Sequence, residues 1–260
     1  MATVRFTLHG DLSDFTRPAT GLAAGPSPVT VTARFEGRAS LKDVLESVGV
    51  PHPEVDLVLC GSRPLTLESP TPADARVDVF PVGAGPSGHA RLVPTSQETP
   101  RFLLDGHLGR LASLLRMLGF DTRWERDADD AALAEASARE DRILLTRDLG
   151  LLKRSAVRRG AFVRGVKHLE QGREVVRRFQ LRSVARPFTR CIRCNTPLRD
   201  ISAAEAAPRV PPRVRERHRR FLACDGCDAL YWPGTHHDAM KGVVASLCGA
   251  PPEAGGPGDR

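Results

Sequence analysis

The chain has 260 residues, of which 41% are hydrophobic and 27% charged, a composition typical of a globular protein with about two domains. No run approaches the roughly 18 apolar residues of a membrane-spanning helix, and the start, Met1-Ala2-Thr3-Val4-Arg5-Phe6, lacks the regions of a signal peptide. We therefore expect a cytoplasmic protein with no membrane partner, in which thiols stay reduced and paired cysteines bind metal.

The net charge of +7 is unevenly distributed along the chain. Residues 1–85 carry 7 basic and 10 acidic side chains, whereas residues 86–260 carry 31 basic and 21 acidic ones. A basic second segment favours a polyanion such as RNA, because Lys and Arg neutralise phosphates. Only four of the 38 basic residues are Lys, as a GC-rich genome would produce, but such a bias does not explain the asymmetry.

The first segment predicts a small α+β domain over residues 1–83. Alternating apolar residues predict strands at 4–8, 29–35, 55–59 and 76–80, and a helix at 41–48 is predicted with Ser40 as its N-cap. This order resembles the β-grasp fold of ubiquitin and of sulfur carriers. A carrier needs a free C-terminal Gly-Gly, and here the chain continues beyond Gly85. We expect an accessory domain that contacts RNA or a protein partner, or a scaffold with no separate activity.

Residues 84–100 are rich in Gly, Pro, Ser and Thr and predict a linker. From residue 101 the pattern alternates between strand and helix. Strands are predicted at 102–104, 121–124, 142–146 and 161–163, and helices at 108–118, 127–140, 149–158 and 168–179. Such alternation is typical of an α/β fold with a parallel sheet flanked by helices, and sites in such sheets form at the carboxyl ends of strands.

Two aspartates, Asp105 and Asp148, follow predicted strands at that edge. Asp130, or its neighbour Asp129, stands in the first turn of the helix between them. Three carboxylates at one edge repel each other without a cation, and Mg²⁺ or Mn²⁺ is the natural partner of carboxylate oxygens. The alternative is that these aspartates only cap exposed N–H groups. No cysteine lies in residues 101–190, so nothing there indicates a covalent nucleophile.

Four cysteines form two Cys-x-x-Cys pairs, Cys191 with Cys194 and Cys224 with Cys227. Two such pairs predict a structural Zn²⁺ site in a zinc ribbon over residues 185–248. The stretch between the pairs predicts a helix from Pro212, whose arginines either contact RNA or are solvated. His236 and His237 follow the second pair and are alternative zinc ligands. Tyr231 and Trp232, in the same segment, either stack on bases or pack on the ribbon. Residues 249–260 predict a disordered tail.

Three segments, 102–112, 115–122 and 142–148, resemble the Mut-seven C-terminal ribonuclease family, a branch of the PIN-like nucleases with an appended zinc ribbon. The segments 187–195, 210–214 and 231–236 resemble its ribbon, and residues 1–83 are similar to the ubiquitin-like module that prokaryotic members carry. The resemblance implies a PIN-like nuclease domain over residues 101–184. It implies an acidic site at Asp105, Asp130 and Asp148 that binds Mg²⁺ or Mn²⁺ and cleaves single-stranded RNA.

Further residues are candidates for support of this site: Asp129, Arg110, Arg147 and Lys153. One departure from the family is Ala131-Ala132, where members often carry an acidic residue. If a second metal needs a carboxylate there, the site holds one metal or is weakened. The sequence thus predicts a metal-dependent ribonuclease. The alternatives are a non-catalytic RNA-binding or ribosome-associated adaptor, and a protein-interaction module centred on the first domain.

Overall fold

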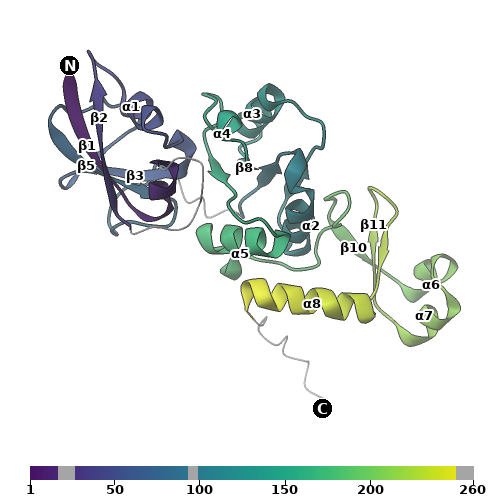
Figure 1. Ribbon diagram of the computed structural model, residues 1–260. Helices are drawn as coiled ribbons and strands as arrows, with labels where there is room; N and C mark the ends of the chain where they lie inside the picture. The colour runs from purple at the N-terminus through teal and green to yellow at the C-terminus, as the bar shows by residue number, and fades with distance from the viewer. Residues whose placement is uncertain (17–26, 93–98, 250–260) are drawn as a thin grey trace. The chain divides into compact units, whose positions relative to one another are not determined.

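Figure 1 shows a computed structural model of the chain, which describes residues 1–16, 27–92 and 99–249. It forms two compact units, Met1–His107 with Glu125–Arg164, and Leu108–Trp124 with the chain from Gly165. The strands are β1 (Ala2–Leu8), β2 (Val29–Phe35), β3 (Val55–Cys60), β4 (Arg63–Leu65), β5 (Ala75–Pro81), β6 (Phe102–Leu104), β7 (Thr122–Trp124), β8 (Ile143–Thr146), β9 (Gly160–Phe162), β10 (Leu198–Ile201), β11 (Phe221–Cys224) and β12 (Leu230–Tyr231). The helices are α1 (Leu41–Ser47), α2 (Gly109–Met117), α3 (Asp130–Arg139), α4 (Leu149–Leu152), α5 (His168–Arg178), α6 (Ala203–Ala206), α7 (Pro212–Arg217) and α8 (Thr235–Cys248).

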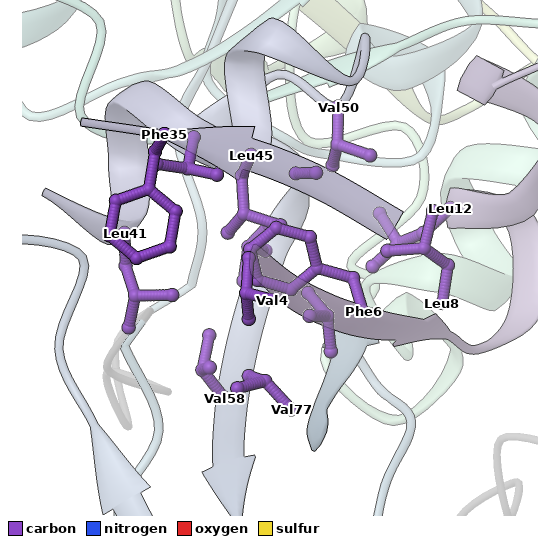
Figure 2. Packing of buried hydrophobic residues seen from close by; sticks show 14 residues of the cluster. Val4, Phe6, Leu8, Leu12, Phe35, Leu41, Leu45, Val50, Val58 and Val77 are labelled. Carbon is purple, nitrogen blue, oxygen red and sulfur yellow. The ribbon is translucent and has the colours of Figure 1, made fainter. Parts of the chain in front are cut away.

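The N-terminal domain is a five-stranded sheet in the order β2-β1-β5-β3-β4, with β1 and β5 parallel and the other neighbours antiparallel. Helix α1 begins after Ser40, whose hydroxyl accepts a hydrogen bond from the backbone N–H of Asp43. Leu41 and Leu45 of this helix are fully buried with Phe6 of β1, and Figure 2 shows these side chains in one core. Burial of each such side chain contributes about 1.5–3 kcal/mol. Strand β4 was not predicted from the sequence.

The second sheet supports the predicted α/β class. Strands β6, β8 and β9 are adjacent and parallel in that order, with Leu104 paired to Leu145 and Leu145 paired to Ala161. Helices α3 and α4 pack on this sheet around a core that includes Leu103, Leu133 and Leu144. The strands are buried on both faces, as the continuous apolar runs predict. The predicted parallel sheet with flanking helices is confirmed.

The N-terminal domain packs against the edge strand β9 through buried polar groups. The carboxylate of Glu54, which is fully buried, accepts a hydrogen bond from the backbone N–H of Phe162. The ring of His52 lies between two acceptors, with Nδ1 2.6 Å from Oε1 of Glu46 and Nε2 2.7 Å from the carbonyl oxygen of Val157. Because an edge strand presents unpaired backbone groups, these contacts cover a sheet edge.

The second unit contains α2, α5 and α8 together with the cysteine-containing module. Helix α5 packs on both α2 and α8, and Gly172 allows the close approach because a Cβ there would lie 3.3 Å from Leu114 and from Leu247. The module is a three-stranded antiparallel sheet, β10-β11-β12, with α6 and α7 between β10 and β11. Its small core includes Phe221 and Val210.

Several element boundaries differ from the prediction. The helix expected at 149–158 ends at Leu152, and the chain then turns so that the carbonyl of Val157 meets His52. The helix from Pro212 has only six residues, and α8 was not predicted. Among the described residues, no helix combines the length and apolar character needed to cross a membrane. The predicted tail beyond Gly249 and the linker residues 93–98 lie outside the described residues.

Candidate functional site

Asp105 follows β6 and is held rigidly at the carboxyl edge of the sheet. Its side chain is only 6% exposed. One carboxylate oxygen accepts hydrogen bonds from the hydroxyl of Thr146 and from the backbone N–H of Arg147 at 3.1 Å, and the other accepts from the backbone N–H of His107 at 3.0 Å. Three donors compensate the burial of a charged group and fix its orientation.

Asp148 lies at the end of β8, where it caps α4. Its Oδ1 accepts from the backbone N–H groups of Gly150 at 2.6 Å and Leu151 at 3.2 Å. Its Oδ2 makes no hydrogen bond to the described part of the chain. The two aspartates share Thr146, whose hydroxyl donates to Asp105 and accepts from the backbone N–H of Asp148 at 2.9 Å. The ends of two neighbouring strands are therefore joined through one buried hydroxyl.

Asp129 and Asp130 have different roles at the start of α3. Asp129 has an extended backbone, and its Oδ1 accepts from the backbone N–H of Ala132 at 2.8 Å, so it is the N-cap. Asp130 is the first helical residue, is half-buried, and makes no side-chain hydrogen bond to the described residues. The structure thus separates the two alternatives that the sequence left open.

A pocket of about 410 Å³ brings the three predicted aspartates to one place. Asp105, Asp130 and Asp148 line it together with Asp127, His107 and Arg126. Four carboxylates outnumber the one arginine and the one histidine in this lining, and this excess of acidic groups favours a cation. The carboxylates do not converge tightly, because among the described residues only the four cysteines form a group whose ligand atoms all lie within 4.8 Å of one another.

Gly106 is required beside this pocket. A Cβ at this position would lie 2.2 Å from the carbonyl oxygen of Arg126, so any larger residue would displace the backbone that carries Arg126 and Asp127. The sequence motif Asp105-Gly106-His107 therefore has a steric reason.

The other candidate residues lie elsewhere. Arg147 donates to the carbonyl oxygens of Val163 and Arg164, at 3.3 and 3.2 Å. Lys153 donates to the carbonyl oxygen of Glu46 at 3.4 Å. Neither of them, nor Asp129 or Arg110, lines the acidic pocket. These contacts favour structural roles for Arg147 and Lys153.

Replacement of Thr146 by Val should destabilise the carboxyl edge of the sheet. The change leaves one N–H and one carboxylate oxygen without their shared partner, at a cost of about 1–3 kcal/mol. Thr146→Ser keeps the hydroxyl and serves as the control. We expect a lower urea midpoint for the Val variant only, and equal midpoints for both variants would contradict the bridging role.

The four cysteines form a site of the size that zinc requires. Their sulfur atoms lie 3.2 Å apart for Cys194 and Cys224, 3.5 Å for Cys191 and Cys227, and 3.7 Å for Cys224 and Cys227. A tetrahedron with Zn–S bonds of about 2.3 Å has edges of about 3.8 Å. The donor set therefore fits a Zn²⁺ ion, and four thiolates leave no coordination position open.

Each Cys-x-x-Cys pair is followed by a residue in the left-handed region, Asn195 at φ 72° and Asp228 at φ 56°. Asn and Asp adopt this conformation more readily than other residues with a Cβ. The hydroxyl of Tyr231 lies 3.1 Å from the sulfur of Cys191, and Trp232 packs on the core of the module. The structure therefore shows both aromatic residues packed against the cysteine module, which is the alternative to base stacking.

The two histidines after the second pair are not in the ligand group. Both lie in the first turn of α8, and the ring of His237 packs on Phe188 with centroids 4.7 Å apart. Burial, together with the charge of Lys241, lowers the pKa of His237. Because its ring packs on Phe188, His237 does not belong to the group of four cysteine ligands, although it follows Cys227 closely in sequence.

In metal-free protein at pH 7 we expect iodoacetamide to alkylate Cys194 before Cys224. Burial opposes ionisation at both, but hydrogen bonds from Thr196 lower the pKa of the Cys194 thiol to about 6, so it is mainly thiolate above pH 6. Burial and the hydrogen bond with Cys194 raise the pKa of Cys224 to about 12, so it stays protonated. Mass spectrometry gives the order, zinc should protect both residues, and faster labelling of Cys224 would contradict this prediction.

Sequence reasoning missed Thr146, Asp127, His107 and Arg126. Thr146 could have been recognised, because a hydroxyl residue two positions before an aspartate at a strand end is a visible sequence signal. The other three had no signal of their own, because only the fold places them at the pocket.

An acidic pocket at the carboxyl edge of a parallel sheet, followed by a four-cysteine module, is an arrangement that suits a nuclease domain with an attached metal-binding module. The chain belongs to the Mut7-C RNAse domain family, whose model matches residues 100–244. Residues 1–85 match the model of the Mut7-C ubiquitin domain. The predicted family and its ubiquitin-like domain are thus confirmed. No curated protein and no solved structure matches the chain.

Proposed function

We propose that this protein is a cytoplasmic Mg²⁺- or Mn²⁺-dependent ribonuclease that hydrolyses phosphodiester bonds of single-stranded RNA. The observation that carries the proposal is the pocket lined by Asp105, Asp130 and Asp148 in a chain of the Mut7-C RNAse domain family. A divalent cation bound there would supply a nucleophilic water and offset the charge of the phosphate.

The three aspartates would contribute differently. Asp105 is fixed by three donors and would supply an oriented carboxylate, whereas Oδ2 of Asp148 and the whole carboxylate of Asp130 make no hydrogen bond to the described residues and would be available to a cation. Mg²⁺ usually keeps several waters and uses one or two carboxylates, so a loose arrangement of three is compatible with it. The basic residues His107 and Arg126 at the same pocket would attract the phosphate.

The segment after Pro212 supports RNA as the partner. Five exposed arginines, Arg213, Arg215, Arg217, Arg219 and Arg220, lie within eight residues. The closest acidic contact recorded for them in the described chain is a long one of 3.9 Å between Arg220 and Asp200. A basic surface with only this one long acidic contact in the described chain suits a phosphate backbone.

In this proposal the zinc ion is structural and the N-terminal domain is a docked scaffold. Four thiolates fill a tetrahedral site. Glu54 contacts Phe162 of β9, and His52 contacts Val157 in the segment before β9. These contacts support a role of the domain in covering the sheet edge. The remaining surface of the domain is then free for a protein partner or RNA.

The metal requirement provides the test. Zinc-loaded protein is dialysed into buffer free of Mg²⁺ and Mn²⁺, and its zinc content is measured before labelled single-stranded RNA is added. We expect cleavage only after Mg²⁺ or Mn²⁺ is restored. This design is sharper than EDTA, which also removes zinc. Undiminished cleavage without either ion would contradict the proposal.

The rival function is a non-catalytic RNA-binding adaptor. It is favoured by one observation, that Asp148 and Asp129 each cap a helix as purely structural aspartates do. RNA binding without cleavage at any Mg²⁺ or Mn²⁺ concentration would support the adaptor.

A further inference from the structure

A second pocket, of about 330 Å³, lies in the unit that contains α2 and the cysteine module. Its walls are apolar, formed by Leu114 and Met117 of α2 and by Ile192, which stands between the first two cysteines. The remaining lining residues are Arg110, Ser113 and His168. None of the lining residues is acidic, in contrast to the aspartate pocket.

The cysteine loop that supplies Ile192 is fixed to α2 by Arg116. This arginine is 6% exposed, and its guanidinium donates to the carbonyl oxygens of Thr122 at 2.9 Å, Arg193 at 2.8 Å and Ile192 at 3.4 Å. A buried cation with three backbone acceptors is costly to disturb. Arg116 is therefore a positioning residue for the Ile192 wall.

Asn195 makes a second connection from the same loop. Its Oδ1 accepts from the backbone N–H of Thr122 at 3.0 Å, and its Nδ2 donates to Asp121 at 2.8 Å. The loop that carries Cys191 and Cys194 is thus tied on two sides to α2 and β7. Zinc binding to these cysteines would hold the Ile192 wall in place.

The chemistry of the pocket fits a base flanked by phosphates. The apolar walls suit the face of a heterocycle, and this pocket volume is at the lower end for small-ligand sites. Arg110 at the rim and Arg193 beside Ile192 are exposed, and neither side chain makes a hydrogen bond to the described residues. Two such cations complement the phosphates on either side of a base, whereas an apolar protein side chain offers them no partner.

We propose that this pocket receives one base of single-stranded RNA and that the zinc-bound loop forms its wall. The inference rests on the proposed ribonuclease function. It assigns a role to the structural zinc, because loss of the metal would release the Ile192 wall and weaken base binding.

The test compares two ligands of equal charge, a short oligoadenylate and the same backbone without bases. Zinc-loaded, full-length Asp148→Asn protein is used without added Mg²⁺ or Mn²⁺, so that cleavage is suppressed during the binding measurement. Ile192→Ser should lower affinity for the oligoadenylate by roughly 5–150-fold, the range for loss of one stacked base, and leave abasic binding unchanged. Arg116→Met should act in the same direction with zinc content retained. Val166→Ser, at a side chain 80% exposed outside the pocket lining, is the matched control.

The ratio of oligoadenylate to abasic affinity is the decisive readout, because general unfolding would weaken both ligands. If the unmodified chain cleaves RNA and Ile192→Ser leaves this ratio unchanged, the base site is overturned and the nuclease function stands, with the pocket left to a protein or a second copy. If the chain neither binds nor cleaves RNA, both proposals fail.

Discussion

Asp148→Asn is expected to lower the rate of RNA cleavage by about 10²–10³, the loss typical when one group that stabilises charge is removed. The variant should still fold, because the Asn side-chain oxygen can accept the N–H groups of Gly150 and Leu151 as the carboxylate does. What it loses is the negative charge of a carboxylate that lines the pocket. Single-turnover cleavage of labelled RNA at saturating Mn²⁺ measures the effect.

Two neighbours in sequence make a matched pair for this experiment. Asp130→Asn should act as Asp148→Asn does, because Asp130 lines the pocket. Asp129→Asn should stay within about twofold of the unmodified chain, since Asn is an equally good N-cap and Asp129 does not line the pocket. Equal losses at 129 and 130 would contradict the assignment. Asp105 is a poorer test, because Asn cannot accept from all three of its donors.

Cys224→Ser is expected to abolish stoichiometric zinc binding and unfold the cysteine module. The sulfur of Cys224 is buried, 3.2 Å from that of Cys194 and 3.7 Å from that of Cys227. Structural zinc contributes apparent binding free energies of about 10–16 kcal/mol, far more than a core of this size supplies. Elemental analysis gives the zinc content, and circular dichroism gives the loss of structure.

Cys248→Ser is the control for that variant. Cys248 is a free, half-buried thiol at the end of α8, outside the group of four. It should retain one zinc per chain. Full zinc content in the Cys224 variant would show that the metal is held elsewhere.

The sheet edge that carries Asp105 and Asp148 was predictable because parallel strands all end on the same side of a sheet. Asp105 and Asp148 each follow an apolar run of strand length, and this alone placed them at one edge. The choice between Asp129 and Asp130 was not predictable, since both suit the first turn of a helix. It depends on the extended backbone of Asp129, which makes Asp129 the N-cap and Asp130 the first helical residue.

Local patterns also misjudged elements whose limits depend on distant contacts. The apolar and basic run after Asp148 suggested a helix through residue 158, but the chain leaves the helix after Leu152 and directs Val157 toward the N-terminal domain. The second pocket was equally hidden, because Ile192 and Leu114 are far apart in sequence and Arg116 gives no sign of its three carbonyl partners. The four-cysteine group, by contrast, was predictable from cysteine spacing alone.

Diffraction from crystals soaked in Mn²⁺, recorded with anomalous scattering, tests the central claim most directly. We expect Mn²⁺ bound to the carboxylates of Asp105 and Asp148, with Asp130 at the same pocket, and a separate zinc signal at the four cysteines. If the protein cleaves RNA in the presence of Mn²⁺ but its crystals show no Mn²⁺ in this pocket, the proposed metal site is contradicted.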